Sequence, residues 1–204
     1  METTVIEGAG VLQSITLLRA DPAEAMPERT ERDAVLLTWV AEGSWAVRDT
    51  FNNGATVFPG DVLRVAAGTG MTMVEGNPSA TEGARIVQLR MRPVREAMIP
   101  GYEVRNFFPE EMDSAPLLVA ALAPHGDQQG NVANACAAVQ LYALRISPAH
   151  SHRLCAVPVQ RFVILVEGTV SIDGTEATTA IAIAEGREAL IESPTGGTVV
   201  IVQL

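Results

Sequence analysis

The sequence contains no lysine, so all 14 of its basic residues are arginines, and it has only three histidines and two cysteines. The two cysteines, Cys136 and Cys155, do not form a Cys-x-x-Cys pair. The usual sequence signature of a structural zinc site or a dithiol redox site is therefore missing. We expect two free, buried thiols in a reducing compartment, with a disulfide between them as the alternative.

Long hydrophobic runs are also absent, since none approaches the roughly 18 apolar residues of a membrane helix. The first ten residues are acidic rather than basic, which is unlike a secretory signal. The formal net charge of −10 repels phosphate backbones and argues against direct binding to nucleic acid. We therefore expect a cytoplasmic protein that contacts neither nucleic acid nor membrane.

Short apolar runs rich in Val, Ile and Thr, bounded by Gly, Pro, Asn and Asp, predict an all-β protein with turns every 8–12 residues or so. The Asn53-Gly54 and Asp173-Gly174 pairs are typical of hairpin turns. The predicted strands are Val11–Leu18, Val35–Ala41, Ser44–Asp49, Ala55–Phe58, Val62–Ala66, Met71–Glu75, Arg85–Met91, Leu117–Leu122, Val139–Ile146, Phe162–Val166, Thr169–Ile172, Ala177–Ile183, Glu188–Glu192 and Thr198–Gln203.

The two halves of the chain look like copies of each other. The stretch WVAEGSWAV matches LVEGTVSI, which aligns Gly43 with Gly168, and the next glycine of the pattern follows after 17 and 18 residues. Each half also contains the tetrapeptide IVQL, at Ile86–Leu89 and Ile201–Leu204. These matches predict a duplication with one domain over residues 1–115 and a second over residues 116–204.

The segments PGDVLRVAAGTGM, IVQLRMRP and PGYEVRNF resemble the pirin family, and the second half is similar to the C-terminal domain of its short bacterial, quercetinase-like members. This resemblance implies two tandem cupin barrels, each a double-stranded β-helix or jelly roll, packed face to face. It also implies a divalent metal, commonly iron, that three histidines and one glutamate hold in the first barrel for dioxygenase chemistry.

Transferring the family's ligand positions onto this sequence puts Arg29, Glu31 and Met73 where the three histidines would stand, and only Glu75 matches. The metal site is thus expected to be degenerate. Three interpretations compete with the simpler one, in which Glu31 is a solvated rim residue and Met73 fills a gap in the core. Arg29 could replace the cation and pair with Glu75 or Glu31. A different ion could bind Glu31, Glu75 and Asp33, or Met73. The pocket could instead hold an organic molecule whose carboxylate or phenolate Arg29 recognises.

The three histidines do not restore a metal site. His150 and His152 form a His-x-His pair, but His152 lies 16 residues before Gly168 and no later histidine follows. We expect this pair in an exposed loop before a strand, where nickel or zinc could bind adventitiously. His125 is expected in a solvated polar loop, and no residue can be assigned a catalytic role.

Two functions follow as hypotheses. The first is a metal-free, monomeric, pirin-like protein that binds an unidentified small molecule or protein and has no oxygenase activity. The second is a quercetin 2,3-dioxygenase-like oxidoreductase that holds a divalent metal such as iron at Glu75 with non-standard ligands. The loss of histidine at Arg29, Glu31 and Met73 favours the first.

Overall fold

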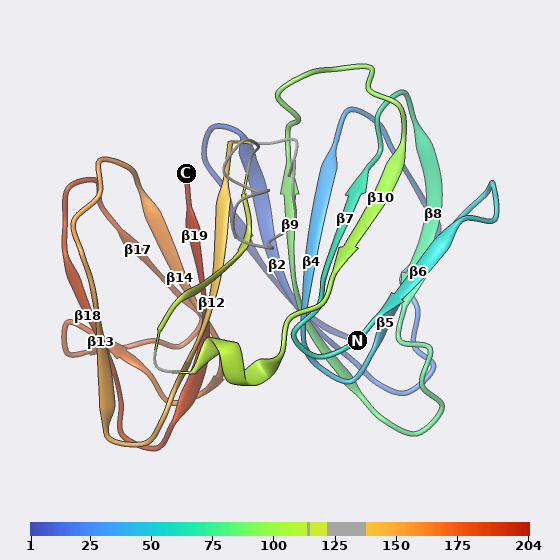
Figure 1. Cartoon of the computed structure of the whole chain (residues 1–204). Helices are drawn as coiled ribbons and strands as arrows, with labels where there is room; N and C mark the ends of the chain where they lie inside the picture. The colour runs from blue at the N-terminus through green and yellow to red at the C-terminus, as the bar shows by residue number, and fades with distance from the viewer. Residues whose placement is uncertain (114, 122–137) are drawn as a thin grey trace. The chain divides into compact units, whose positions relative to one another are not determined.

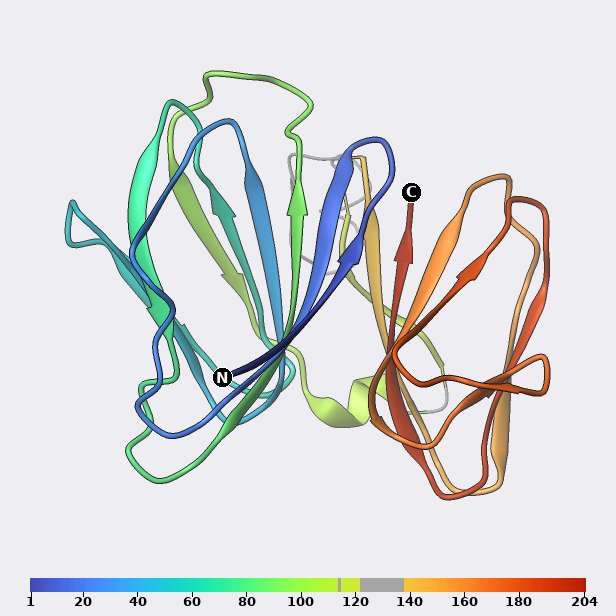
Figure 2. The ribbon, with the colours of Figure 1, turned by 180° about the vertical axis from the view of Figure 1, so that it is seen from behind.

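The computed structural model describes residues 1–113, 115–121 and 138–204, and nearly all of its regular structure is β-strand (Figures 1 and 2). The chain divides into two compact units, Met1–Phe108 with Ala121–Ala138, and Pro109–Ala120 with Val139–Leu204. The sequence-based boundary after residue 115 falls inside Pro109–Ala120, the segment that packs with the second unit. In the described part of the chain, no helix is long and apolar enough to cross a membrane.

The first unit is built from two antiparallel sheets, with strand orders β1-β2-β9-β4-β7-β10 and β3-β8-β5-β6. Buried side chains from both sheets form one core, in which Leu36 and Val65 of the larger sheet meet Trp45 and Met73 of the smaller. The strands are β1 (Glu2–Glu7), β2 (Leu12–Ala20), β3 (Arg29–Glu31), β4 (Val35–Glu42), β5 (Trp45–Asp49), β6 (Gly54–Val57), β7 (Val62–Ala66), β8 (Met71–Gly76), β9 (Ala84–Met91) and β10 (Gly101–Arg105).

The second unit repeats this plan with sheets in the orders β11-β12-β19-β14-β17 and β13-β18-β15-β16. Its own core includes Val163, Ile191 and Ile201. The elements are the 3₁₀ helix η1 (Pro109–Met112) and the strands β11 (Leu117–Ala120), β12 (Gln140–Ile146), β13 (His150–Leu154), β14 (Arg161–Gly168), β15 (Ser171–Ile172), β16 (Thr175–Glu176), β17 (Ala180–Ile183), β18 (Ala189–Ser193) and β19 (Gly197–Gln203).

The two units have the same topology, because β2-β9-β4-β7 corresponds to β12-β19-β14-β17 and β3-β8-β5-β6 to β13-β18-β15-β16. Gly43 and Gly168 occupy equivalent turns with φ of 73° and 80°. A Cβ at Gly43 would lie 2.1 Å from the Gly83 carbonyl oxygen, and one at Gly168 would lie 2.2 Å from that of Gly196. Glycine is required at both turns for the same two reasons. The fold is therefore a tandem pair of cupin barrels, as the family resemblance implies.

The IVQL match, by contrast, is not part of this repeat. Thr38 and Val163 each lie five residues before their turn glycine and are thus equivalent. Thr38 pairs with Gln88, whereas Val163 pairs with Ile201. The counterpart of Gln88 is therefore Ile201 and not Gln203, so the two tetrapeptides are out of register by two residues.

Several strands were not predicted, namely β1, β3, β10, β13 and β16. The most consequential is β13, because the expected loop around His150 and His152 is in fact this strand. The sequence of β13 is mostly polar and lacks the alternating apolar pattern of a strand, since only Leu154 is fully buried. Cys155 also differs from expectation, because its thiol is free but exposed. His125 and Cys136 lie outside the described residues.

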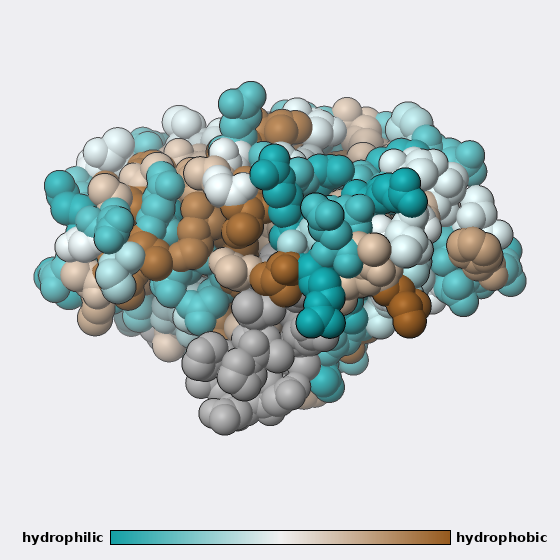
Figure 3. Space-filling view, turned by 90° about the horizontal axis from the view of Figure 1, so that it is seen from above, coloured by the Kyte–Doolittle hydropathy of each residue, from teal (hydrophilic) through white to brown (hydrophobic). Residues whose placement is uncertain are grey.

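The surface mixes polar and apolar side chains (Figure 3). The large hydrophobic residues with the greatest exposure are Ile99, Phe108 and Phe51, at 88%, 73% and 72%. They come from separate segments of the chain, and exposed hydrophobic residues are common on folded proteins.

Candidate functional site

Strand pairing brings the four candidate residues together inside the first barrel. β3 pairs with β8, which sets Arg29 opposite Met73, and β8 pairs with β5, which sets Glu75 opposite Val47. Along β8, Met73 and Glu75 are buried while Val74 between them is exposed. Because strand side chains alternate between faces, Met73 and Glu75 both point into the barrel.

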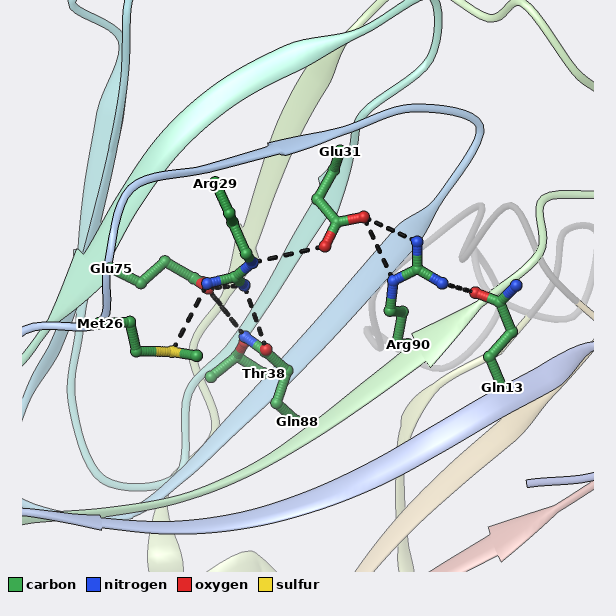
Figure 4. Close-up of polar contacts among 8 residues, drawn as sticks. All are labelled: Gln13, Met26, Arg29, Glu31, Thr38, Glu75, Gln88 and Arg90. Carbon is green, nitrogen blue, oxygen red and sulfur yellow. Dashed lines mark hydrogen bonds and ion pairs between the residues drawn. The ribbon is translucent and has the colours of Figure 1, made fainter. Parts of the chain in front are cut away.

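Arg29 lies at the centre of this cluster (Figure 4). Its Nη2 donates to Glu75 Oε2 and, at 3.4 Å, to Gln88 Oε1. Its Nε lies 3.4 Å from Glu31 Oε1, and its Nη1 lies 3.5 Å from Met26 Sδ. The Arg29 side chain remains 23% exposed. One guanidinium thus pairs with both carboxylates of the cluster, Glu75 strongly and Glu31 at longer range.

Glu75 is the deepest charged group of the cluster, with 0% of its side chain exposed. Besides Arg29, its carboxylate accepts from Gln88 Nε2, at 3.1 Å for Oε1 and 3.3 Å for Oε2. The same Gln88 nitrogen also lies 2.9 Å from Thr38 Oγ1. Both oxygens of the buried carboxylate therefore have donors, as a buried charge requires.

A second arginine extends the network from Glu31. Arg90 donates to Glu31 Oε2 from Nη2 at 2.8 Å and from Nε at 3.2 Å, and its Nη1 donates to Gln13 Oε1 (Figure 4). The side chain of Glu31 is 10% exposed and that of Arg90 is 36% exposed. Two guanidinium groups and two carboxylates balance, so the formal charge of the network is zero.

Tyr102 and Asp49 are further polar groups of this barrel. Burial raises the pKa of Tyr102, and the negative charges of Asp49 and Glu75 raise it further. Its hydroxyl donates to Met71 Sδ at 3.3 Å. Burial opposes ionisation of Asp49, but hydrogen bonds from the Asn53 side chain and from the Asn53 and Phe51 backbone outweigh it and lower the pKa of Asp49.

The bonds made within the cluster determine which of its atoms are left for a divalent metal. Among the described residues, no group of three or more His, Cys, Asp or Glu is placed to hold an ion. Glu75 is bonded to a cationic side chain, and Met73 offers only a thioether, which suits soft metals. Asp33 is used elsewhere, since its Oδ1 accepts from the Ala97 backbone N–H at 2.7 Å. The cluster presents the N–H donors of the Arg29 and Arg90 guanidinium groups.

The second barrel has no such polar cluster at the equivalent positions. Val47 pairs with Glu75, and its counterpart Ile172 pairs with Ile191, so Ile191 stands for Glu75. Ala189 lies two residues before Ile191, as Met73 lies two residues before Glu75. Leu154 pairs with Ala189 and Arg29 pairs with Met73, so Leu154 is the counterpart of Arg29. The counterparts of Arg29, Thr38, Glu75 and Gln88 are thus Leu154, Val163, Ile191 and Ile201, all buried and apolar.

One buried charge does occur in the second barrel. Arg161 is 3% exposed and occupies the position of Leu36 in the first barrel. It donates from Nη1 to the Cys155 carbonyl at 2.9 Å and from Nη2 to the Arg187 carbonyl at 2.5 Å, while its Nε has no partner. None of the ion pairs within residues 1–113, 115–121 and 138–204 involves this guanidinium, and burial lowers its pKa.

The His-x-His pair belongs to the second unit, where it lies on β13. His150 is exposed, and its Nδ1 lies 2.9 Å from the Pro148 carbonyl oxygen. His152 is partly buried opposite Ile191. Adventitious metal binding by these two histidines on one strand stays a prediction.

Sequence analysis did not identify Gln88, Thr38, Arg90, Gln13 and Met26 as members of the cluster. The signal for Gln88 was its place in the apolar stretch IVQLRM, at a position that strand alternation turns inward. Arg90 lies two residues further along the same strand. Neither could be connected to Glu31 or Glu75 without the strand register.

Comparison with known proteins shows what the chain is similar to. A pirin family model matches residues 13–91. A quercetin 2,3-dioxygenase of Escherichia coli K12 is 28% identical over 153 residues, which cover 75% of this chain and 64% of that protein. A Mycobacterium tuberculosis protein with a provisional quercetin 2,3-dioxygenase name is 26% identical over 154 residues, which cover 76% and 62%. The match spans less than two thirds of these relatives.

Solved structures agree with the sequence relatives. The bacterial pirin YhhW of Escherichia coli in complex with nickel(II) superimposes with a TM-score of 0.80 at 25% identity, covering 97% of this chain and 83% of that one. The Escherichia coli protein YhaK superimposes with a TM-score of 0.79 over 100% of this chain and 93% of its own, but at 14% identity it supports the fold alone.

Proposed function

We propose that the chain is a metal-free member of the pirin family of bicupins, which binds a small molecule or a protein partner and has no oxygenase activity. The observation that carries this proposal is the ion pair of Arg29 with the buried carboxylate of Glu75. By the family resemblance, Glu75 is the one retained ligand position. A fixed guanidinium is therefore bonded to the group that would otherwise bind the metal.

The charges of the cluster support the same conclusion. Arg29 and Arg90 neutralise Glu31 and Glu75, so a divalent cation would add two positive charges beside two guanidinium groups. A metal at Glu75 would first have to displace Arg29, and an arginine cannot lose its proton to accommodate it. Arg29 is thus proposed to take over the cation's electrostatic role while adding no coordination chemistry.

The alternative function is a quercetin 2,3-dioxygenase-like oxidoreductase that uses a divalent metal such as iron. The names of the relatives favour it. It requires Glu75 to release Arg29 and to find non-standard partner ligands, and Met73 and Glu31 are the side chains of the transferred motif that remain for this purpose. A shared fold alone does not transfer the activity.

The proposal extends to partners and location. The net charge of −10 disfavours direct nucleic-acid binding, and we propose a cytoplasmic monomer without membrane contact. The apolar counterparts of the cluster in the second barrel support a single small-molecule site in the first barrel, with the second barrel structural at those positions.

Oxygen uptake with quercetin tests the proposed function. The untagged protein is incubated in turn with iron(II), copper(II) and nickel(II), and the oxygen electrode trace is compared with that of metal alone. We expect no uptake above the metal control. Metal-dependent uptake that disappears in the near-isosteric variant Glu75→Gln, while that variant remains folded, would establish the dioxygenase function instead.

A further inference from the structure

We propose that Arg29 and Arg90 form a clamp for the carboxylate of a small organic monoanion, which takes the place that the Glu31 carboxylate holds in this structure. The inference rests on the proposed function, since it assigns a ligand class to the metal-free cluster around Arg29, Glu31 and Glu75. Glu31 then acts as an internal substitute for the ligand and competes with it.

The position of the Glu31 carboxylate supports this assignment. It bridges the two guanidinium groups, with Oε1 3.4 Å from Arg29 Nε and Oε2 2.8 Å from Arg90 Nη2. Planar guanidinium groups are well suited to carboxylate oxygens. Both arginines are reachable from solvent, because their side chains are 23% and 36% exposed. A carboxylate from solution can therefore meet both donors at the place where Glu31 meets them.

Arg29 has unused hydrogen-bonding capacity toward such a ligand. Its Nη2 is committed to Glu75, but its Nη1 has only the Met26 thioether at 3.5 Å, which is a weak acceptor. Its contact with Glu31, at 3.4 Å, is longer than the roughly 2.7–2.9 Å of a good charge-assisted hydrogen bond. A ligand carboxylate that approached more closely would gain contacts that Glu31 does not make.

The balance of charge selects a monoanion. Glu75 is fully buried and held by Arg29 and Gln88, so it stays in place. Glu31 is buried on the three-residue strand β3, with 10% of its side chain exposed, and it bonds to Arg29 and Arg90, so an incoming carboxylate competes with Glu31 for these two donors. One carboxylate in its place keeps the cluster neutral, whereas a cation would meet two guanidinium groups and a dianion would add charge close to Glu75.

Benzoate is the probe for this site, and benzamide is its neutral analogue. Dissociation constants are measured by isothermal titration calorimetry on protein whose metal content is determined in the same sample. We expect Glu31→Gln, which removes the competing charge, to tighten benzoate binding about tenfold or more, and Arg90→Gln to weaken it by a similar factor, the ratio expected for one charge-assisted hydrogen bond. Benzamide should bind neither variant measurably.

The exposed pair Arg153 and Glu188 in the second unit, with Arg153 Nη1 3.4 Å from Glu188 Oε2, supplies matched controls. Arg153→Gln and Glu188→Gln should leave benzoate binding unchanged. If Arg90→Gln does not fold, Arg90→Lys replaces it, because lysine keeps the charge but loses the planar fork.

Two results would overturn the clamp while leaving the metal-free function intact. One is an absence of benzoate binding to both the native chain and folded, metal-free Glu31→Gln. The other is benzamide binding as tightly as benzoate. Benzoate binding that requires a bound metal and is lost with a chelator would instead overturn the proposed function on which the clamp rests.

Discussion

Replacing Arg29 by methionine should destabilise the first barrel, because it leaves the Glu75 carboxylate buried without its cationic partner. Breaking one side of a buried ion pair costs about 3–5 kcal/mol. Glu75 is 0% exposed, which favours a large cost, but Gln88 still donates to both of its oxygens and Arg29 itself is 23% exposed. We therefore expect a loss near the lower limit, about 3 kcal/mol in the free energy of unfolding.

Urea unfolding followed by tryptophan fluorescence measures this loss in the right part of the molecule. The chain has two tryptophans, Trp39 and Trp45, and both are buried in the first unit. The signal therefore reports on the first barrel. Adding Glu75→Gln to Arg29→Met should restore most of the lost stability, since a neutral amide needs no counter-charge.

Arg105→Met is the matched control, because Arg105 is 47% exposed and its Nε lies 3.3 Å from Glu103 Oε1 on the surface of the same unit. Exposed pairs of this kind contribute about 0–1 kcal/mol. A loss of stability in Arg29→Met no greater than in this control would show that Glu75 does not depend on Arg29. The same conclusion would follow if the second substitution, at Glu75, restored nothing.

Further predictions concern three other positions. Burial and the charge of Asp49 raise the pKa of Tyr102 above its ordinary 10.0, so the stabilising effect of the tyrosine is full below about pH 10 and is lost at higher pH, where the unfolded chain ionises. Tyr102→Phe should therefore reduce the fall in the urea midpoint between pH 8 and pH 11. A fall as large as that of the native chain would contradict this prediction. Arg161→Leu, which installs the residue type of the equivalent Leu36, should stabilise the second barrel by about 1–2 kcal/mol, since it removes a buried charge that has no ion-pair partner among the described residues. Thermal unfolding followed by circular dichroism should show a higher melting temperature for the variant, and a lower one would contradict the prediction. Gly168→Ala should cost at least about 1 kcal/mol in the same assay, because its φ is 80° and a Cβ would meet the Gly196 carbonyl oxygen, and a melting temperature equal to that of the native chain would contradict this.

The fold could be predicted from the sequence because local patterns encode it. Alternating apolar residues located most of the strands, and the glycines at Gly43 and Gly168 marked equivalent turns whose backbone only glycine tolerates well. The same kind of local match failed for IVQL, since register depends on pairing between distant strands. A tetrapeptide of common strand residues carries too little information to fix that pairing.

The candidate site could be predicted only in part. The family motif identified Arg29, Glu31, Met73 and Glu75, and the structure brings these positions together in one barrel. Gln88 and Arg90, which connect the cluster to β9, were missed because their contacts join residues 13 to 77 positions apart. The polar strand β13 was missed because its pattern is mostly exposed, and burial is what strand alternation detects.

The metal content of the native protein tests the central claim most directly. Untagged protein, purified without nickel resin or chelator, is analysed by inductively coupled plasma mass spectrometry beside the variant Arg29→His, Glu31→His, Met73→His, which restores the family's ligand types next to Glu75. Our account predicts far less than one metal ion per native chain and a clear gain in bound metal for the variant. Near-stoichiometric iron, copper or nickel in the native chain would contradict it.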